Sequence, residues 1–524
     1  MYFMFAAEPN YLTELYHSIV GPPVLPPQWS LGWHQCRWGY KNLDMLKEVV
    51  ANYTLFNLTL DTMWSDIDYL NKYEDFTYDH VNFDGLGDWV NGLHDQSMHY
   101  IPIIDAGIAK REGYEVYEDG VNQDVFIKTE NGDVFTGQVW PDDAAFPDWF
   151  GENTASWWGN WLSKLHDQVG FDGLWEDMNE ASNFCNGVCY ENERAMDPIK
   201  NKIPYTPSGR DLEEKSITLD GKHAGDITEL DVHSLFGTME VKATHDWFIA
   251  QGKRPMIIER SAYAGMGKYG SRWLGDNFSQ EAYMGYSVTG IMAHNIAGIQ
   301  LAGSDICGFI GDTNAELCAR WYMVGAFYPF SRNHNAWDSM PQEPWHFQEV
   351  YDQSVSYLDI IRYAQEVKMS MIKYYYTWMS LNSYGGGAFY KPLFFDYPND
   401  DAAMNASQNH NIMLGSALKL SIQSTTLGKD GGNSTEFYFP AGLWCNVFNK
   451  DGTNGCMDLS AGQSMTLSTL AYEFYLHMAA GNIAPMQDGK TLHMNSNVTT
   501  IAGLQEHPVD FHILPACDAS ACNA

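Results

Sequence analysis

Short apolar runs recur between residues 31 and 333, and most are separated by stretches whose apolar positions repeat every three or four residues. Runs of this length are typical of buried strands, and the longer repeat is typical of amphipathic helices. Residues 42–53 show the helical pattern behind Asn42 as the expected N-cap. The alternation predicts an α/β protein with a (β/α)8 TIM barrel. Its strands are expected at residues 31–36, 58–64, 100–105, 172–177, 255–260, 271–276, 299–305 and 326–333.

Two connections between these strands are much longer than ordinary loops. They cover residues 106–154, after the third strand, and residues 181–230, after the fourth. Insertions at these places would stand on the face of the barrel that carries the chemistry. After the barrel, short alternating strands with Gly and Asn turns predict a β-sandwich domain. The expected order is a lead-in segment at 1–28, the barrel at 29–383 and a C-terminal β-rich domain at 384–524.

Composition narrows the classes of partner. A chain of 524 residues is too long for one core, and with 45% hydrophobic residues it is apolar enough for two domains. A formal net charge of -36 would repel nucleic acid and anionic membranes at every approach. No run reaches the roughly 18 apolar residues of a membrane span, and no signal peptide is visible. We therefore expect a neutral or cationic small-molecule or oligosaccharide substrate, no nucleic acid and no membrane span.

The nine cysteines are spaced mainly as close pairs. In a secreted chain this spacing predicts four local disulfides and one free thiol. Cysteine and histidine do not cluster as a zinc site would require. Sequons for N-glycosylation support a secretory route only weakly, since an Asn-rich chain contains several by chance. The expected pairs are Cys185–Cys189, Cys307–Cys318, Cys445–Cys456 and Cys517–Cys522, with Cys36 alone, and the sequons lie at Asn52, Asn57, Asn277, Asn405, Asn433 and Asn497.

Acidic and aromatic residues gather where the predicted strands end. In the stretch FDGLWEDMNEASNF (171–184), Leu174 would face the packed interior, and Asp177 and Glu180 would rise at the carboxyl end, where barrel enzymes keep their chemistry. Three acids within five residues cannot all be buried, and an acidic surface loop is the plain alternative. Other strand ends supply Asp61, Asp66, Asp105, Arg260, Asp276, Asp305, Arg332 and His334, with Trp38, Trp64, Trp140, Trp175, Trp273 and Phe309 among them.

A crater of carboxylates and aromatic faces suits a sugar, because hydroxyl groups need acceptors and pyranose C–H faces stack on indole rings. A metal site is the weaker interpretation, since Trp and Arg are interleaved with the acids. Neither phosphate-binding glycine motif follows a strand. Glycoside cleavage requires two carboxyl groups on opposite faces of the bond. Asp177 and Asp276 lie on strands two apart and are candidates for this pair, although their spacing leaves the separation open.

Six ordered motifs carry a resemblance to a known family. The chain contains WHQCRWGY, DTMWSDIDYL, WEDMNEASNF, RSAYAGMGKYGSRWLGDN, LAGSDICGF and FYPFSRNHN. These resemble the motifs of glycoside hydrolase family 31 α-glucosidases of the acid maltase, sucrase-isomaltase and maltase-glucoamylase type. The likeness extends from about Tyr2 to Val509.

The resemblance implies a role for each matching residue. Asp177 would be the nucleophile that forms a glycosyl-enzyme intermediate, and Asp276 would act first as general acid and then as base. The carboxyl groups of such a retaining pair lie about 5 to 5.5 Å apart. Asp305 would be a strand-end acid beside the pocket, and Cys307 and Cys318 match a disulfide of the acid maltase group. The glucose ligands would be Asp66, Arg260 and His334, and the aromatic walls Trp38, Trp140, Trp175, Trp273 and Phe309.

The chain also departs from the family pattern. Glu176 stands where the family usually has an aliphatic residue, Ala181 replaces a common Pro, and Phe278 stands where acid maltases tend to have Trp. Glu176 is expected to raise the proton affinity of neighbouring acids by like-charge repulsion. Family members usually carry a β-sandwich domain before the barrel and a further β domain at the far end. These have no room here, so we expect a fragment or a shortened product.

The resemblance implies a retaining exo-acting α-glucosidase that releases terminal α-1,4-linked glucose from maltose-like oligosaccharides, with no cofactor and no metal. Alternatives are α-xylosidase, glycoprotein-trimming glucosidase or transglucosylase activity at the same site. A truncated, non-catalytic carbohydrate-binding protein is the alternative from another class. The acidic composition fits a lysosome, an acidic vacuole or the extracellular space, because low pH relieves self-repulsion.

Overall fold

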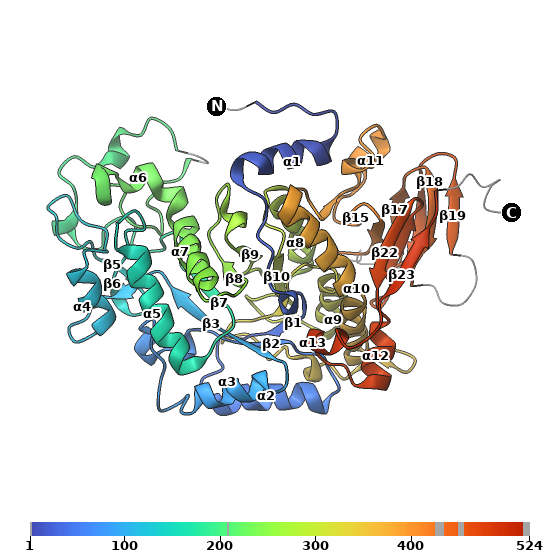
Figure 1. Ribbon diagram of the computed structural model, residues 1–524, viewed down its shortest axis with the longest axis horizontal. Coiled ribbons are helices and arrows are strands. Elements are labelled where there is room, and N and C mark those ends of the chain that lie inside the picture. The colour runs from blue at the N-terminus through green and yellow to red at the C-terminus, as the bar shows by residue number, and fades with distance from the viewer. Residues whose placement is uncertain (1–2, 207–208, 425–433, 449–454, 517–524) are drawn as a thin grey trace. The chain divides into compact units, whose positions relative to one another are not determined.

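The computed structural model describes residues 3–206, 209–424, 434–448 and 455–516 (Figure 1). It contains two compact units. The first comprises Met1–Arg37, Val49–Thr62 and Trp273–Ala524, and the second comprises Trp38–Glu48 and Met63–Arg272. Among the described residues, no helix combines the length and the apolar character that crossing a membrane requires.

A closed barrel of eight parallel strands confirms the predicted fold class. The strand order is β1, β11, β10, β9, β8, β7, β3, β2. Each strand overlaps one of the eight predicted segments. The bounds are β1 (Trp33–Gln35), β2 (Thr62–Ser65), β3 (His99–Asp105), β7 (Leu174–Asp177), β8 (Ile257–Glu259), β9 (Ser271–Leu274), β10 (Ala302–Ile306) and β11 (Ser331–Asn333).

Helices of the second unit follow the predicted pattern. At the start of α2 (Leu43–Leu55), the Met45 N–H donates to Asn42 Oδ1 over 2.9 Å, which confirms the N-cap. Helices α5 (Thr154–Val169) and α7 (Phe236–Ala250) lie side by side (Figure 1). Trp157 and Trp158 of α5 are fully buried, as expected for helix packing. Two shorter helices, α3 (Leu86–His94) and α4 (Glu115–Asn122), complete this layer.

Both long insertions have structure of their own. The first contains a three-stranded antiparallel sheet in the order β4, β6, β5. The second carries the predicted Cys185–Cys189 disulfide and the short helix α6 (Glu229–Val232). The strands of the first insertion are β4 (Ile108–Ala109), β5 (Gly137–Val139) and β6 (Asp142–Ala145).

A buried histidine joins the second insertion to the first. His223 places Nδ1 2.9 Å from Asp148 and Nε2 2.8 Å from Glu229, and the side chains of His223 and Glu229 are fully buried. Both ring nitrogens donate only in the imidazolium form. Burial by itself lowers the pKa of His223, but the hydrogen bonds to the two carboxylates outweigh it and raise the pKa to about 9. His223 is therefore a cationic bridge between two acids.

We expect His223→Gln to lower the free energy of unfolding by about 3 kcal/mol at pH 6, because two buried carboxylates lose their cation. The pKa of His223 is raised on folding, so its contribution is complete below about pH 6.5 and disappears as the pH rises through about 9. Thermal unfolding of wild type and variant at pH 6 and pH 9.5 measures this. The exposed His80→Gln variant is the control, and an equal loss at both pH values would contradict the bridge.

The barrel part of the first unit contains α8 (Glu281–Ile296), α9 (Ala315–Gly325) and α10 (Tyr357–Gly385). A capping box of Ser356 and Asp359 starts α10, which packs along α9 (Figure 1). Helix α1 (Pro9–Val20) lies in the lead-in segment, where no element was predicted from the sequence. His17 links α1 to the rest of the first unit. The His17 Nδ1 accepts from the Gly387 N–H over 3.0 Å, and the His17 Nε2 lies 3.1 Å from the Ile296 carbonyl oxygen.

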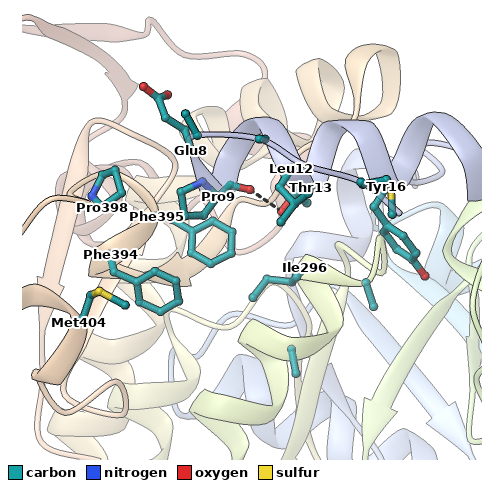
Figure 2. Close-up of a pocket in the computed structure, with 15 residues that line it drawn as sticks. Glu8, Pro9, Leu12, Thr13, Tyr16, Ile296, Phe394, Phe395, Pro398 and Met404 are labelled. Carbon is teal, nitrogen blue, oxygen red and sulfur yellow. Dashed lines mark hydrogen bonds between the residues drawn. The ribbon is translucent and has the colours of Figure 1, made fainter. Parts of the chain in front are cut away.

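An apolar pocket of about 930 Å³ opens beside α1. Figure 2 shows Leu12 and Tyr16 of α1, Ile296 of α8 and the phenyl rings of Phe394 and Phe395 around it. Apolar side chains dominate this lining, with Glu8 at its edge. The pocket is a feature of the lead-in segment and lies entirely within the first unit.

The C-terminal part of the chain is a β-sheet domain, as predicted. A six-stranded sheet has the order β14, β15, β16, β21, β18, β19, and β17 pairs with β20. Side chains from both sheets, including Met413, Phe437 and Trp444, share one core. The bounds are β14 (Tyr390–Pro392), β15 (Asn411–Leu414), β16 (Leu418–Ser421), β17 (Ser434–Phe439), β18 (Gly442–Asn446), β19 (Cys456–Leu459), β20 (Gln463–Ser468) and β21 (Tyr475–Ala479), with a further pair of β22 (Asn482–Met486) and β23 (Asp510–Leu514).

Three of the four predicted disulfides are present: Cys185–Cys189, Cys307–Cys318 and Cys445–Cys456. Cys36 is buried and belongs to none of these disulfides, also as predicted. The proposed pair Cys517–Cys522 lies outside the described residues.

Candidate active site

The second unit presents Asp177 at the carboxyl end of β7. In the sheet register, Asp177 lies opposite Asp105 of β3. The Arg260 guanidinium, from the end of β8, approaches Asp177 Oδ1 to 3.1 Å through Nη1. Its Nε and Nη2 each donate over 2.9 Å to the two oxygens of Glu180. Arg260 therefore forms ion pairs with both Asp177 and Glu180, and Glu180 fixes the guanidinium plane, a role that sequence reasoning missed.

Aromatic side chains of the same unit meet in pairs. The rings of Trp64 and Trp175 have centroids 5.9 Å apart. Those of Trp38 and Trp140 are 5.4 Å apart, and Trp140 also contacts Phe184 at 5.1 Å. Edge-to-face packing of this kind holds large side chains in defined orientations. Ring contacts thus fix three of the predicted wall residues: Trp38, Trp140 and Trp175. Phe184, which contacts Trp140, was not singled out from the sequence.

A buried acid, Asp105, lies among the charges of this half of the site. Burial and then the charge of Asp75 raise the pKa of Asp105 well above its usual value, and the charges of Asp177 and Asp66 add to the effect. The Arg260 cation opposes it. Asp105 therefore binds its proton more tightly than an exposed aspartate does. Asp66, the predicted glucose ligand, accepts a hydrogen bond from the Ile67 N–H over 2.6 Å.

Three glutamates are buried behind Asp177, on strands β7 and β8 and on helix α7. Glu176, Glu240 and Glu259 are each 0% exposed. Thr244 of α7 donates to Glu176, and the Asn179 amide donates to Glu259 over 3.1 Å. Burial raises the pKa of Glu176 to about 8, and burial followed by the Glu176 charge raises the pKa of the other two well above normal. The expected like-charge effect of Glu176 thus acts on Glu240 and Glu259.

This cluster predicts a pH-dependent stability. Glu176 keeps its proton up to about pH 8 in the folded state but loses it near pH 4.5 when the chain is unfolded. Its contribution to the free energy of folding is therefore complete below pH 4.5 and is lost as the pH rises to about 8. The slope is up to about 1.4 kcal/mol per pH unit for one proton. We expect Glu176→Gln to unfold at nearly the wild-type temperature at pH 5 and at a higher temperature at pH 8.

Scanning calorimetry between pH 5 and pH 8 measures the effect. The exposed Glu130→Gln variant serves as the matched control. Parallel curves for wild type and Glu176→Gln over this range would show that the buried carboxyl does not retain its proton.

The first unit presents Asp276 on the loop after β9. Asp276 is exposed and has a φ of 55°, a left-handed conformation that few non-glycine residues adopt. Asp305 holds this turn, because its Oδ2 accepts from the Asp276 N–H over 2.9 Å and its Oδ1 accepts from Arg332 over 2.9 Å. The Asn277 side chain donates to the Asp305 carbonyl and accepts from the Asp305 N–H. The Asn277 side chain is thus buried and engaged with the Asp305 backbone.

The remaining predicted residues of this unit are joined to the same cluster. The Arg332 guanidinium lies 5.6 Å from the Trp273 ring. The rings of Phe309 and His334 have centroids 4.9 Å apart, and Phe309 N–H donates to the Asn277 carbonyl over 2.7 Å. Burial and then the Arg332 charge lower the pKa of His334 well below normal, so its imidazole is neutral. The loops after β9, β10 and β11 thus form one connected group around Asp305.

Comparison with known proteins gives the family. The description "Glycosyl hydrolases family 31 TIM-barrel domain" matches residues 23–378, and "Glycosyl hydrolase family 31 C-terminal domain" matches residues 386–484. Lysosomal alpha-glucosidase of Rattus norvegicus is 36% identical over 509 residues, which cover 93% of this chain and 51% of the rat protein. Alpha-xylosidase 1 of Arabidopsis thaliana is 34% identical and covers 95% of this chain and 55% of its own.

Solved structures agree with this relationship. A glucosidase II alpha subunit crystallised in a DNJ-bound form superposes with a TM-score of 0.84 at 25% identity, over 98% of this chain and 51% of the other. The chain spans about half the length of the curated relatives it matches.

Proposed function

Since this chain belongs to glycosyl hydrolase family 31, we propose that it is a retaining exo-acting α-glucosidase that releases terminal, non-reducing α-1,4-linked glucose. The observation that carries the proposal is Asp177, set at a barrel strand end and paired with Arg260 at 3.1 Å. A guanidinium at this distance favours the ionised carboxylate, which is the form that a nucleophile requires. The α-glucosidases among the relatives support the choice of substrate.

In the proposed reaction, Asp177 attacks the anomeric carbon while Asp276 protonates the departing glycosidic oxygen. The C–O bond to the leaving sugar breaks as the ester bond to Asp177 forms. Asp276, then ionised, removes a proton from water, and the water oxygen displaces Asp177. Two inversions give net retention, for which a carboxyl separation of about 5 to 5.5 Å is expected.

The role of Asp276 is supported by its setting. Its side chain is exposed on a turn that the side chains of Asp305 and Asn277 hold by hydrogen bonds to backbone groups. A group that gives and takes a proton must reach both the leaving oxygen and water, and a fixed turn lowers the cost of placing it. Asp305 would therefore be a positioning residue for Asp276.

Recognition of the glucose would rest on three polar side chains. Asp66 accepts hydrogen bonds from sugar hydroxyls, Arg260 donates to them, and the neutral His334 does either. The C–H faces of the ring would stack on aromatic walls, for which we propose Trp38, Trp140, Trp175, Trp273 and Phe309.

A panel of substrates tests the activity and its alternatives. We expect maltose and para-nitrophenyl α-glucoside to be hydrolysed, and para-nitrophenyl α-xyloside to be poor. Preferred cleavage of the xyloside would favour α-xylosidase, the activity named for the Arabidopsis relative. Preferred cleavage of glucosylated mannose oligosaccharides would favour glycoprotein trimming, and glucosyl transfer to maltose would favour a transglucosylase. Binding of oligosaccharide by a folded chain without any turnover would identify a carbohydrate-binding protein.

We also propose an acidic or extracellular place of action, such as a lysosome, an acidic vacuole or the secreted fraction. The three disulfides require oxidising conditions for their formation. The buried, protonated glutamates behind Asp177 favour folding at low pH. Lysosomal relatives support the same placement.

A further inference from the structure

A row of aromatic side chains begins two residues after Asp276. The Phe278 and Tyr283 rings have centroids 5.2 Å apart, and those of Tyr283 and Tyr286 are 5.7 Å apart. Phe278 is 40% and Tyr286 66% exposed. Single exposed rings are ordinary on protein surfaces, but these three contact one another, at interplanar angles of 51° and 73°, and form one continuous aromatic patch. We call Phe278, Tyr283 and Tyr286 the aromatic track.

The track is built on the same backbone as the proposed acid. Ser279 N–H donates to the Ile310 carbonyl over 2.9 Å, and Ser279 Oγ donates to the Gly311 carbonyl over 2.8 Å. These bonds hold the loop after β9 against the loop after β10. Tyr283 and Tyr286 follow in the first turns of α8. The first ring is therefore fixed relative to Asp276, and the other two lie on a rigid helix.

The exposed face of α8 carries no charge. Its exposed residues are Ala282, Tyr286, Thr289 and Ala293, and Glu281 is the one acidic residue of the helix. A solvent-facing side of a surface helix normally carries charged residues. In a chain with a net charge of -36, a neutral aromatic face favours a neutral ligand. Tyrosine and phenylalanine rings offer flat apolar faces for pyranose C–H groups, and the tyrosine hydroxyl groups add hydrogen bonds.

We propose that the aromatic track binds an α-glucan chain through the sugar units beyond the bond that is cleaved. This inference rests on the proposed function and extends it to the length of the substrate. Maltose ends one unit beyond that bond, whereas a maltoheptaose chain continues along the track. The enzyme is thus a glucosidase of longer maltooligosaccharides, whose preference is set by Tyr283 and Tyr286.

The test measures hydrolysis of maltose and of maltoheptaose by the Tyr286→Ala variant. The matched control is Tyr384→Ala, because Tyr384 is another exposed helix tyrosine of the same unit. One stacking contact contributes about 0.5–1.5 kcal/mol. For Tyr286→Ala we therefore expect the ratio of kcat/KM for maltoheptaose to that for maltose to fall roughly 3- to 10-fold, mainly through KM. Tyr286→Phe should keep most of the preference, and Tyr384→Ala should keep all of it. An unchanged ratio for Tyr286→Ala overturns the track.

A binding measurement separates this inference from the catalytic proposal. The catalytically disabled Asp177→Ala chain is run in native gels that contain soluble starch. The track predicts that starch retards this chain and that adding Tyr286→Ala removes much of the retardation. If starch retards the Asp177→Ala chain but the wild-type chain does not hydrolyse maltose, the aromatic track is supported and the proposed function is overturned. Equal retardation with and without Tyr286 would overturn the track alone.

Discussion

Replacement of Asp177 by Ala is expected to lower kcat for maltose on the order of 10⁴-fold or more, because no other group in the site takes over the covalent step. Asp177 is the proposed nucleophile, and its carboxylate lies 3.1 Å from Arg260. Arg260 retains its two hydrogen bonds to Glu180 in the variant. The fold should therefore persist, with a Tm close to that of wild type, while turnover is lost.

Azide distinguishes loss of the nucleophile from loss of the fold. The space left by Asp177→Ala admits azide, which attacks the anomeric carbon of an activated aryl α-glucoside and gives β-glucosyl azide. The exposed Asp84→Ala variant of the same unit is the matched control and should have wild-type kinetics. Wild-type turnover of maltose by Asp177→Ala would remove the nucleophile assignment and the double displacement with it.

Replacement of Asp305 by Asn is expected to lower the free energy of unfolding by about 3–5 kcal/mol, because the fully buried Arg332 loses its carboxylate. The same change weakens the hydrogen bond that the Asp276 N–H donates to Asp305 Oδ2. Since that bond holds the left-handed turn at Asp276, kcat should fall at temperatures where the variant is still folded. Urea unfolding and kinetics on the same samples measure both effects.

A double variant separates charge from geometry at Asp305. Adding Arg332→Gln to Asp305→Asn removes the buried cation that faced Asp305, so part of the lost stability should return. The turn at Asp276 gains no carboxylate from this change, and kcat should stay low. Recovery of kcat together with stability would mean that Asp305 acts only on the fold and does not position Asp276.

The barrel could be predicted because its signals are local. Strand and helix segments alternate along the chain, and the Asn42 cap lies only three residues from the N–H that it accepts. Strand bounds were less certain. Residues 58–61 were included in a predicted strand but precede β2, and the Leu60 N–H donates to the carbonyl of Thr499. Contacts to such distant residues leave no trace in the local pattern.

The members of the candidate site are proposed from sequence motifs, whereas their contacts come from the structure. Sequence reasoning proposed both Asp177 and Arg260. The hydrogen bonds that Arg260 donates to Glu180 join two loops that are 80 residues apart in the sequence. Glu176 stood out as an acid in an aliphatic position. Its neighbours Glu240 and Glu259 could not be predicted, because they meet Glu176 only when α7 packs against β7 and β8. The pairing of Asp177 with Asp276 remains a proposal.

The most direct measurement is NMR of the glucose anomer that the purified chain first releases from maltose at pH about 4 to 7. Double displacement through Asp177 predicts α-glucose, with β-glucose appearing only at the rate of mutarotation. Early β-glucose would contradict the covalent intermediate and make Asp177 a base for direct attack by water. Absence of glucose from a chain shown to be folded would contradict the proposal that these residues suffice for catalysis.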